Sequence, residues 1–164
     1  MMISRVRGEF ESFSGTVEFD EANPAATTVT VDVDVNSINT RVADRDNHLR
    51  SADFFNVSEQ PVMSFRSTKV ELTGGNTAKM TGDLSIRGVT KPVVLDVEYS
   101  GLAKSPWGTT SAGFSATGVI RRTEWGLTWN APLETGGLLV GEDVTITLEV
   151  ELVRQEAPEA VALA

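Results

Sequence analysis

Apolar and polar residues alternate with a period of two along most of this 164-residue chain. Residues 28–35 read T-V-T-V-D-V-D-V, with each valine on one side of the backbone and threonine or aspartate on the other. The same alternation returns near the C-terminus, at residues 144–152. Because successive side chains of a strand point to opposite faces, this pattern predicts antiparallel strands with one face in water.

Turn-forming residues divide the remaining chain into further strands. Clusters rich in glycine, proline or asparagine mark turns at residues 74–76, 88–92 and 101–108. We expect a first hairpin of two strands around the Ser14-Gly15 turn, at residues 4–13 and 16–20, and later strands at 62–72, 77–86, 93–99 and 110–122. Seven or eight short strands at this spacing predict either a barrel or a sandwich, and the pattern alone leaves both open.

One segment, residues 41–51, breaks the alternation and predicts a short helix. It contains no glycine or proline, and Val42 and Leu49 lie seven positions apart on one helical stripe. The hydroxyl of Thr40 can cap its start. We therefore expect one short helix laid across an otherwise all-β domain of residues 1–154, followed by a flexible tail at 155–164.

Composition and charge narrow the classes of function. The chain has no cysteine, which excludes disulfides and thiolate zinc sites. Its net charge is −9 and its 14 lysines and arginines are scattered, which argues against a nucleic-acid partner and against docking on an anionic membrane. No apolar run approaches the roughly 20 residues that span a bilayer, and no signal peptide is evident. We expect a cytoplasmic protein without stable membrane insertion.

Candidate catalytic chemistry is sparse. His48 is the only histidine, and its neighbours Asp44 and Asp46 do not converge with it as metal ligands should. We expect a structural or mouth-lining role for this residue. No serine sits in a G-x-S-x-G elbow, so we expect no catalytic residue and no enzyme activity. The glycine-rich segment 133–141 lacks the lysine of a phosphate loop. We expect it to be a mobile lid or a strand-entry loop whose apolar residues 138–140 close over a cavity.

Two groups of residues have two interpretations each. Arg121, Arg122 and Glu124 adjoin a tryptophan-rich segment, residues 125–129. Either an arginine contacts the polar headgroup of a ligand, or, as we favour, these residues form a solvated charge pair beside tryptophans that close one barrel end. The Phe54-Phe55 pair either gates the mouth of the barrel or pins the helix to it.

Three stretches of the chain together resemble the YceI-like family of lipid-binding barrels. The first reads RDNHLRSADFFNV and is followed by PVMSFRS, at residues 45–57 and 61–67. The second, TGDLSIRGVTKPV at residues 81–93, is similar to the family outline GxLxIxGxTKPV. The third runs from FSAT at residue 114 through EWGL at 124–127. The three occur in the family's order, and the resemblance covers residues 4–153.

The resemblance implies an extended, eight-stranded antiparallel barrel of lipocalin-like shape, with a helix near one end and a long apolar pore. Such a pore accommodates a polyisoprenoid chain, for example the tail of an isoprenoid quinone. Burial of each CH₂ contributes about 0.8 kcal/mol, so apolar walls supply affinity without charged anchors.

We therefore expect binding, storage or transport of an isoprenoid lipid, with no metal and no required cofactor. The alternative is a stress-associated or scaffold barrel with a filled core and no physiological lipid. The residues expected to line the ligand are Phe10, Phe13, Phe54, Phe55, Phe65, Leu84, Ile86, Phe114, Ile120, Trp125, Trp129 and Leu138.

The chain departs from the family at its start. Family members begin with a strand of the type HSxVxFxVxH, and this first strand is missing here. A barrel without it has two unpaired edges, which invite pairing with another chain. We therefore expect a homodimer. A truncated start would also remove any signal peptide, which weakens the cytoplasmic assignment.

Overall fold

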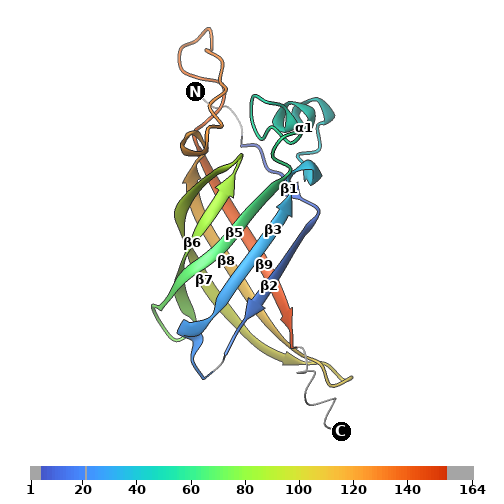
Figure 1. Ribbon diagram of the computed structural model, residues 1–164, viewed down its shortest axis with the longest axis vertical. Helices are drawn as coiled ribbons and strands as arrows, with labels where there is room; N and C mark the ends of the chain where they lie inside the picture. The colour runs from blue at the N-terminus through green and yellow to red at the C-terminus, as the bar shows by residue number, and fades with distance from the viewer. Residues whose placement is uncertain (1–4, 21, 155–164) are drawn as a thin grey trace.

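The computed structural model of the chain describes residues 5–20 and 22–154 (Figure 1). Its main body is one antiparallel sheet that curls into an incomplete barrel. The strands are β2 (Phe13–Glu18), β3 (Thr28–Asp34), β5 (Val62–Leu72), β6 (Thr77–Ile86), β7 (Val89–Lys104), β8 (Thr110–Arg121) and β9 (Asp143–Val153). They are bonded in the order β2-β3-β5-β6-β7-β8-β9, so each strand pairs with its neighbours along the chain within this sheet.

Smaller elements lie outside the main sheet. The short strands β1 (Glu9–Phe10) and β4 (Ile38–Asn39) pair with each other. The helix α1 (Ala43–Arg50) lies beyond one end of the sheet, close to β1 (Figure 1). Three 3₁₀ turns complete the description: η1 (Pro24–Ala26), η2 (Val35–Ser37) and η3 (Arg122–Trp125).

The cross-strand register collects the apolar positions on the concave face of the sheet. Val31 of β3 pairs with Phe65 of β5, which in turn pairs with Leu84 of β6. In the other half of the sheet, Val97 of β7 pairs with Ala116 of β8. These residues are buried or half-buried, whereas most residues between them in sequence are exposed. The alternation in the sequence therefore corresponds to the wet and dry faces of one sheet.

The predicted all-β fold with one short helix is confirmed, and the predicted first hairpin is wrong. Ser14 and Gly15 lie inside β2, where Gly15 pairs with Val31. A Cβ on Gly15 would lie 2.9 Å from the carbonyl oxygen of Thr30, so this glycine permits close strand approach instead of a turn. Residue 4, the start of the predicted first strand, lies outside the described residues, as does the predicted flexible tail at 155–164.

Two predicted element boundaries also differ from the structure. The strand predicted at residues 93–99 extends in both directions into β7. Beyond Tyr99 it continues because Gly101 (φ 111°) accommodates a bulge between Tyr99 and Gly101 without ending the strand. The helix starts later than predicted: Arg41 has a φ of 67°, and the N-cap is Val42, without a side-chain capping bond. Thr40 therefore does not cap α1.

Thr40 instead helps to attach α1 to the rest of the protein. The buried carboxylate of Asp46 accepts a bond from the Thr40 backbone N–H at 2.8 Å and another from the Thr40 hydroxyl. Arg50 donates to the carbonyl oxygens of Asn36 and Ile38 at 3.0 and 2.9 Å. The hydroxyl bond from Thr40 is the main cause that lowers the pKa of Asp46 below its ordinary value of 3.8. These charged residues are therefore structural.

Seven strands cannot close into a barrel through antiparallel pairing alone. Neighbouring strands run in opposite directions, so the two edge strands, β2 and β9, run in the same direction. Antiparallel closure of this sheet would need one more strand between these two edges. We call the unpaired line between β2 and β9 the seam. Phe13 of β2 is 63% exposed beside it.

The unpaired seam generates a test of self-association. If copies pair through it, Val17→Lys should shift the protein from dimer to monomer in sedimentation velocity, because an inward-pointing charge on an edge strand opposes strand addition. Thr16→Lys, which places the same charge on the outer face of β2, should leave the dimer intact. A monomeric wild-type protein would contradict pairing through the seam.

The Asp46 carboxylate generates a test by pH. Because the pKa of Asp46 is lower in the folded than in the unfolded protein, its stabilising contribution is present above pH 3.8 and is lost as the pH falls through the folded pKa. In urea unfolding, wild type should therefore exceed Asp46→Asn in the free energy of unfolding near neutral pH, and the difference should shrink below pH 3.8. The exposed control Asp44→Asn should show little difference; a pH-independent gap for Asp46→Asn would refute the assignment.

Candidate functional site

The concave face of the sheet is lined with apolar side chains, and their packing is uneven. One buried cluster contains Phe54, Phe65, Met80, Leu84, Ile86, Leu95, Trp125 and Leu127. Along β8 and β9 the inward-facing side chains, such as Phe114, Ile146 and Leu148, are only half-buried. The interior is therefore tightly packed in one region and loosely covered in another.

The end of the interior nearest α1 is closed by five residues that we call the plug: Phe54, Arg122, Trp125, Leu127 and Trp129. Trp125 is only 2% exposed, and its indole Nε1 donates to the carbonyl oxygen of Leu84 at 2.9 Å. Trp125 follows β8 whereas Leu84 belongs to β6, so this bond carries the indole across β7 on the concave side. A buried tryptophan with its N–H satisfied is a stable wall for an apolar interior.

Arg122 holds the plug together. Its side chain is buried, and its Nε donates to the carbonyl oxygen of Gly141 at 2.7 Å. The two terminal nitrogens donate to the carbonyl oxygens of Leu127, Trp129 and Val140. The guanidinium carbon also lies 5.8 Å from the centre of the Phe54 ring. Burial lowers the pKa of Arg122.

The two neighbouring arginines therefore have different roles, and the expectation of one solvated pair is wrong for Arg122. The donors of Arg122 are directed to backbone carbonyls, so this residue fastens the 127–141 loop to the barrel. Arg121 is exposed, and its Nε lies 3.8 Å from a carboxylate oxygen of Glu142. Alternating strand geometry points these adjacent side chains to opposite faces at the end of β8.

His48 packs against the outer side of the plug. Its ring makes edge-to-face contacts with Phe54 and Trp129, with centroid distances of 5.0 and 4.5 Å. Its Nε2 lies 2.9 Å from a carboxylate oxygen of Asp53. Among residues 5–20 and 22–154, no group of three or more His, Cys, Asp or Glu side chains could hold a metal ion. The position of His48 agrees with a structural role at this end of the barrel.

Three aromatic rings occupy the opposite end of the interior. Phe19, just after β2, lies 5.4 Å from Phe114 of β8 and 6.1 Å from Tyr99 of β7. Tyr99 and Phe114 are 5.0 Å apart. Side chains thus join the first part of the sheet to its last strands, although the backbones of β2 and β9 do not pair. Phe19 and Tyr99 are not among the predicted ligand residues, although the period-two pattern places Phe19 on the same face as Val17.

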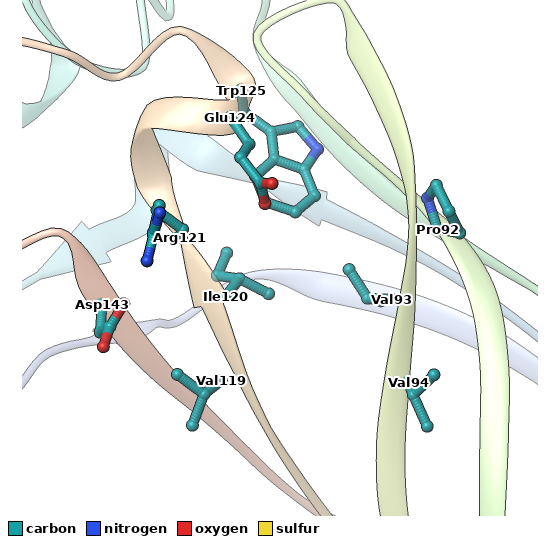
Figure 2. A pocket seen from close by; sticks show the side chains of 9 residues that line it. All are labelled: Pro92, Val93, Val94, Val119, Ile120, Arg121, Glu124, Trp125 and Asp143. Carbon is teal, nitrogen blue, oxygen red and sulfur yellow. The ribbon is translucent and has the colours of Figure 1, made fainter.

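A hollow of about 450 Å³ opens in the barrel wall between β7 and β8. Figure 2 shows the two strands diverging towards Trp125, with Val93 and Val94 on one strand and Val119 and Ile120 on the other. Arg121, Glu124 and Asp143 also line the hollow, together with Pro92. We call this hollow the side opening.

Most of the predicted ligand residues lie on or around the concave face. Phe65, Leu84 and Ile86 belong to the buried cluster. Phe114 and Ile120 lie on the concave side of β8, where Ile120 also lines the side opening. The predicted Phe54, Trp125 and Trp129 all belong to the plug.

The other predicted ligand residues lie elsewhere. Phe10 and Phe55 contact each other edge-to-face at 5.8 Å, outside the main sheet. Phe13 is on the concave side of β2 but beside the seam. Leu138 is 50% exposed in a loop that projects beyond the strands (Figure 1), so the predicted lid does not close over a cavity. An apolar residue in a glycine-rich loop looks the same in sequence whether it covers a cavity or faces solvent, so the sequence could not separate Leu138 from the residues of the concave face.

No helix within the described part of the chain is long and apolar enough to cross a membrane.

Comparison with known proteins places the fold in a family. The family profile described as the YceI-like domain matches residues 1–152. A UPF0312 protein of Ectopseudomonas mendocina (strain ymp) is 41% identical over 148 residues, which are 90% of this chain and 74% of that protein. A UPF0312 protein of Pectobacterium atrosepticum is 42% identical over 149 residues, covering 91% of this chain and 74% of its own.

Solved structures show the same architecture. The crystal structure of a YceI protein from Campylobacter jejuni superposes with a TM-score of 0.81 at 35% identity, covering 95% of this chain and 89% of that one. BcnA of Burkholderia cenocepacia superposes with a TM-score of 0.75 at 23% identity, covering 88% of this chain and 86% of its own. The second likeness concerns the fold alone.

The role of Arg122 can be tested by its stability effect. Arg122→Met should lower the free energy of unfolding by about 2–4 kcal/mol, because it leaves several buried carbonyl oxygens of the 127–141 loop without donors. Arg121→Met, a change of the same kind on the exposed neighbour, should stay within about 0.5 kcal/mol of wild type. Urea denaturation measures both. Equal effects at the two positions would show that Arg122 does not hold the plug.

Proposed function

This chain belongs to the YceI-like family, and from that premise we propose that it binds an isoprenoid lipid, a polyisoprenoid or an isoprenoid quinone, against its concave face. The observation that carries the proposal is the half-buried apolar surface along β8 and β9. Phe114, Ile120 and Leu148 face inward and are incompletely covered by other side chains. Apolar side chains that face an interior without filling it are suited to an apolar guest.

The chemistry of this surface fits an isoprenoid chain better than a charged ligand. The inward positions of β9 are Val144, Ile146, Leu148, Val150 and Leu152. None of these side chains offers a hydrogen bond, so a guest there gains affinity by removing apolar area from water, about 25 cal/mol per Å². A methyl-branched hydrocarbon tail presents such area along its whole length.

We further propose a carrier or store of lipid, without enzyme activity and without a required cofactor. The polar groups around the interior are engaged in holding the fold: Arg122 binds loop carbonyls, and Trp125 binds Leu84. His48 lies beside Asp53 on the outer side of the plug, away from the concave face of β8 and β9. This arrangement supports binding and suggests no acid–base pair facing a bound tail.

The alternative is a barrel with a filled core and no physiological lipid. The buried cluster around Leu84 and Ile86 would suit that alternative, since such packing resembles an ordinary core. The loose cover of Phe114 and Ile120 favours a lipid, because β8 is not an edge strand and a filled core would bury its inward side chains as fully as Leu84. The cytoplasmic location stays a prediction.

We also propose self-association along the seam. The edges of β2 and β9 present unpaired backbone groups, which are templates for an added strand. A second copy can supply that strand, and the expected homodimer then follows from the same missing pairing that opens the barrel.

Lipid extraction and a matched set of variants test the proposed function. Organic extraction of protein purified from its own host, read by mass spectrometry, should release an isoprenoid lipid at near-stoichiometric yield. Phe114→Glu and Ile120→Glu should each reduce capture at least tenfold, equivalent to about 1.4 kcal/mol, because a carboxylate then faces the tail. Thr117→Glu, on the outer face of β8, is the control and should bind normally.

Two results would overturn the proposal. One is a protein that carries no lipid from its host and captures none from lipid suspensions. The other is capture that survives both inward substitutions in variants whose circular dichroism and thermal unfolding match wild type.

A further inference from the structure

Aromatic side chains occupy both ends of the interior. The plug, with Trp125 at its centre, closes the end near α1. Phe19, Tyr99 and Phe114 meet at the other end, with ring centroids 5.0–6.1 Å apart. A long apolar guest on the concave face therefore reaches solvent more readily through the wall than through either end.

The wall is interrupted at the side opening. Backbone pairing between β7 and β8 runs from the pair Lys104–Thr110 to the pair Asp96–Thr117 and ends there. Beyond this point β7 continues to Val89 and β8 continues to Arg121, and Figure 2 shows them diverging. Pro92 lies in this stretch of β7, and proline has no N–H to donate to a neighbouring strand.

The lips of the side opening are apolar on the outside as well as the inside. Val94 and Val119, on the outer face, are 52% and 65% exposed. Farther along the same face the paired residues are Asp96 and Thr117, which are polar and exposed, as expected for a solvated surface. At the side opening, where β7 and β8 separate, apolar residues therefore lie on both the inner and the outer face of the barrel wall. This combination suits the passage of a hydrocarbon chain through the wall.

A polar rim lies beside these lips. Arg121 lines the hollow together with Glu124 and Asp143. The Nε of Arg121 lies 3.8 Å from the nearest oxygen of Glu142, longer than a hydrogen bond, and the side chain is 61% exposed. Its N–H groups can therefore donate to an oxygen of a ligand headgroup. Arg122, the next residue, cannot serve in this way, because its donors are engaged inside the plug.

We propose that the side opening is the route by which an isoprenoid lipid crosses the barrel wall, with its tail between Val93 and Ile120 and its headgroup outside at Arg121. The inference rests on the proposed lipid-binding function and deepens it. It assigns a ligand class: an isoprenoid tail that carries a headgroup with oxygen acceptors, as a quinone does.

The seam is the competing route, and its chemistry is less suitable. It exposes backbone N–H and C=O groups along the full edges of β2 and β9. Drawing an apolar chain past such groups removes them from water without a partner, which costs free energy. At the side opening the unpaired part of β8 is confined to residues 118–121, and the facing part of β7 contains Pro92, which has no N–H. The seam therefore favours an added strand, and the side opening favours a lipid tail.

A disulfide across the side opening tests the route. The chain has no cysteine, so Val94→Cys with Val119→Cys gives one possible intramolecular bond. A disulfide needs the two Cα atoms within about 7 Å, so its formation draws the lips together. The matched control is Asp96→Cys with Thr117→Cys, the last bonded pair of the same two strands, where oxidation changes no opening.

Each variant is first loaded with a short-tailed isoprenoid quinone while its cysteine pair is reduced. The pair is then oxidised, and the protein is mixed with phosphatidylcholine vesicles. Oxidation of the Val94/Val119 variant should slow release of the quinone at least tenfold, and reduction should restore the rate. The Asp96/Thr117 control variant should release the quinone at the same rate whether it is oxidised or reduced. Equal release by the oxidised and reduced Val94/Val119 variant would overturn the proposal and indicate passage along the seam.

The headgroup assignment has its own measurement. Arg121→Gln should weaken equilibrium binding of the quinone severalfold and leave binding of squalene, an isoprenoid hydrocarbon without a headgroup, unchanged. The control is Arg66→Gln. Arg66 is an exposed arginine of β5 that pairs with Asp32 of β3, and its substitution should change the binding of neither ligand. Equal loss of both ligands in Arg121→Gln would refute a headgroup contact. Binding of neither ligand by wild type would instead refute the proposed function itself.

Discussion

Antiparallel pairing within a single sheet is the constraint on which this structure depends. One apolar face must leave water, and a lone sheet achieves this only by curling until that face covers itself. The main sheet of the described residues has an odd number of strands, so its edges β2 and β9 run in the same direction and stay unpaired. The aromatic contacts of Phe19 with Tyr99 and Phe114 hold the curl without help from backbone bonds.

The same incompleteness explains the uneven packing of the interior. Fully buried inward side chains, such as Leu84 and Leu95, belong to strands in the middle of the sheet. Inward side chains of β9, at the edge, are half-exposed. At the α1 end, Arg122 compensates for the lack of a further strand by tying a long loop to the barrel through backbone carbonyls. Burying a cation costs desolvation free energy, and here neutral carbonyl oxygens alone offset that cost. Loss of any of these hydrogen bonds would therefore destabilise the fold.

The charged residues of the family-like segment 45–57 have a structural role in this protein. Asp46 and Arg50 attach α1 to the segment around Ile38, and His48 packs on the plug. The motif therefore identifies the fold, whereas ligand binding is a property of the apolar concave face. These two aspects are separable, and relatives with the same motif could hold different guests.

The sequence alone determined the strands and their faces, because period-two alternation is a local property that the backbone turns directly into geometry. It also determined that residues such as Phe65, Phe114 and Ile120 share the inner face. It misplaced the first hairpin, because a glycine that permits close strand approach looks like a turn in sequence. Only the tertiary structure separated Arg121 from Arg122, placed Leu138 in solvent and opened β7 from β8, since each depends on contacts between residues distant in the chain. Alternation fixes which way a side chain points, and only packing decides what it meets there.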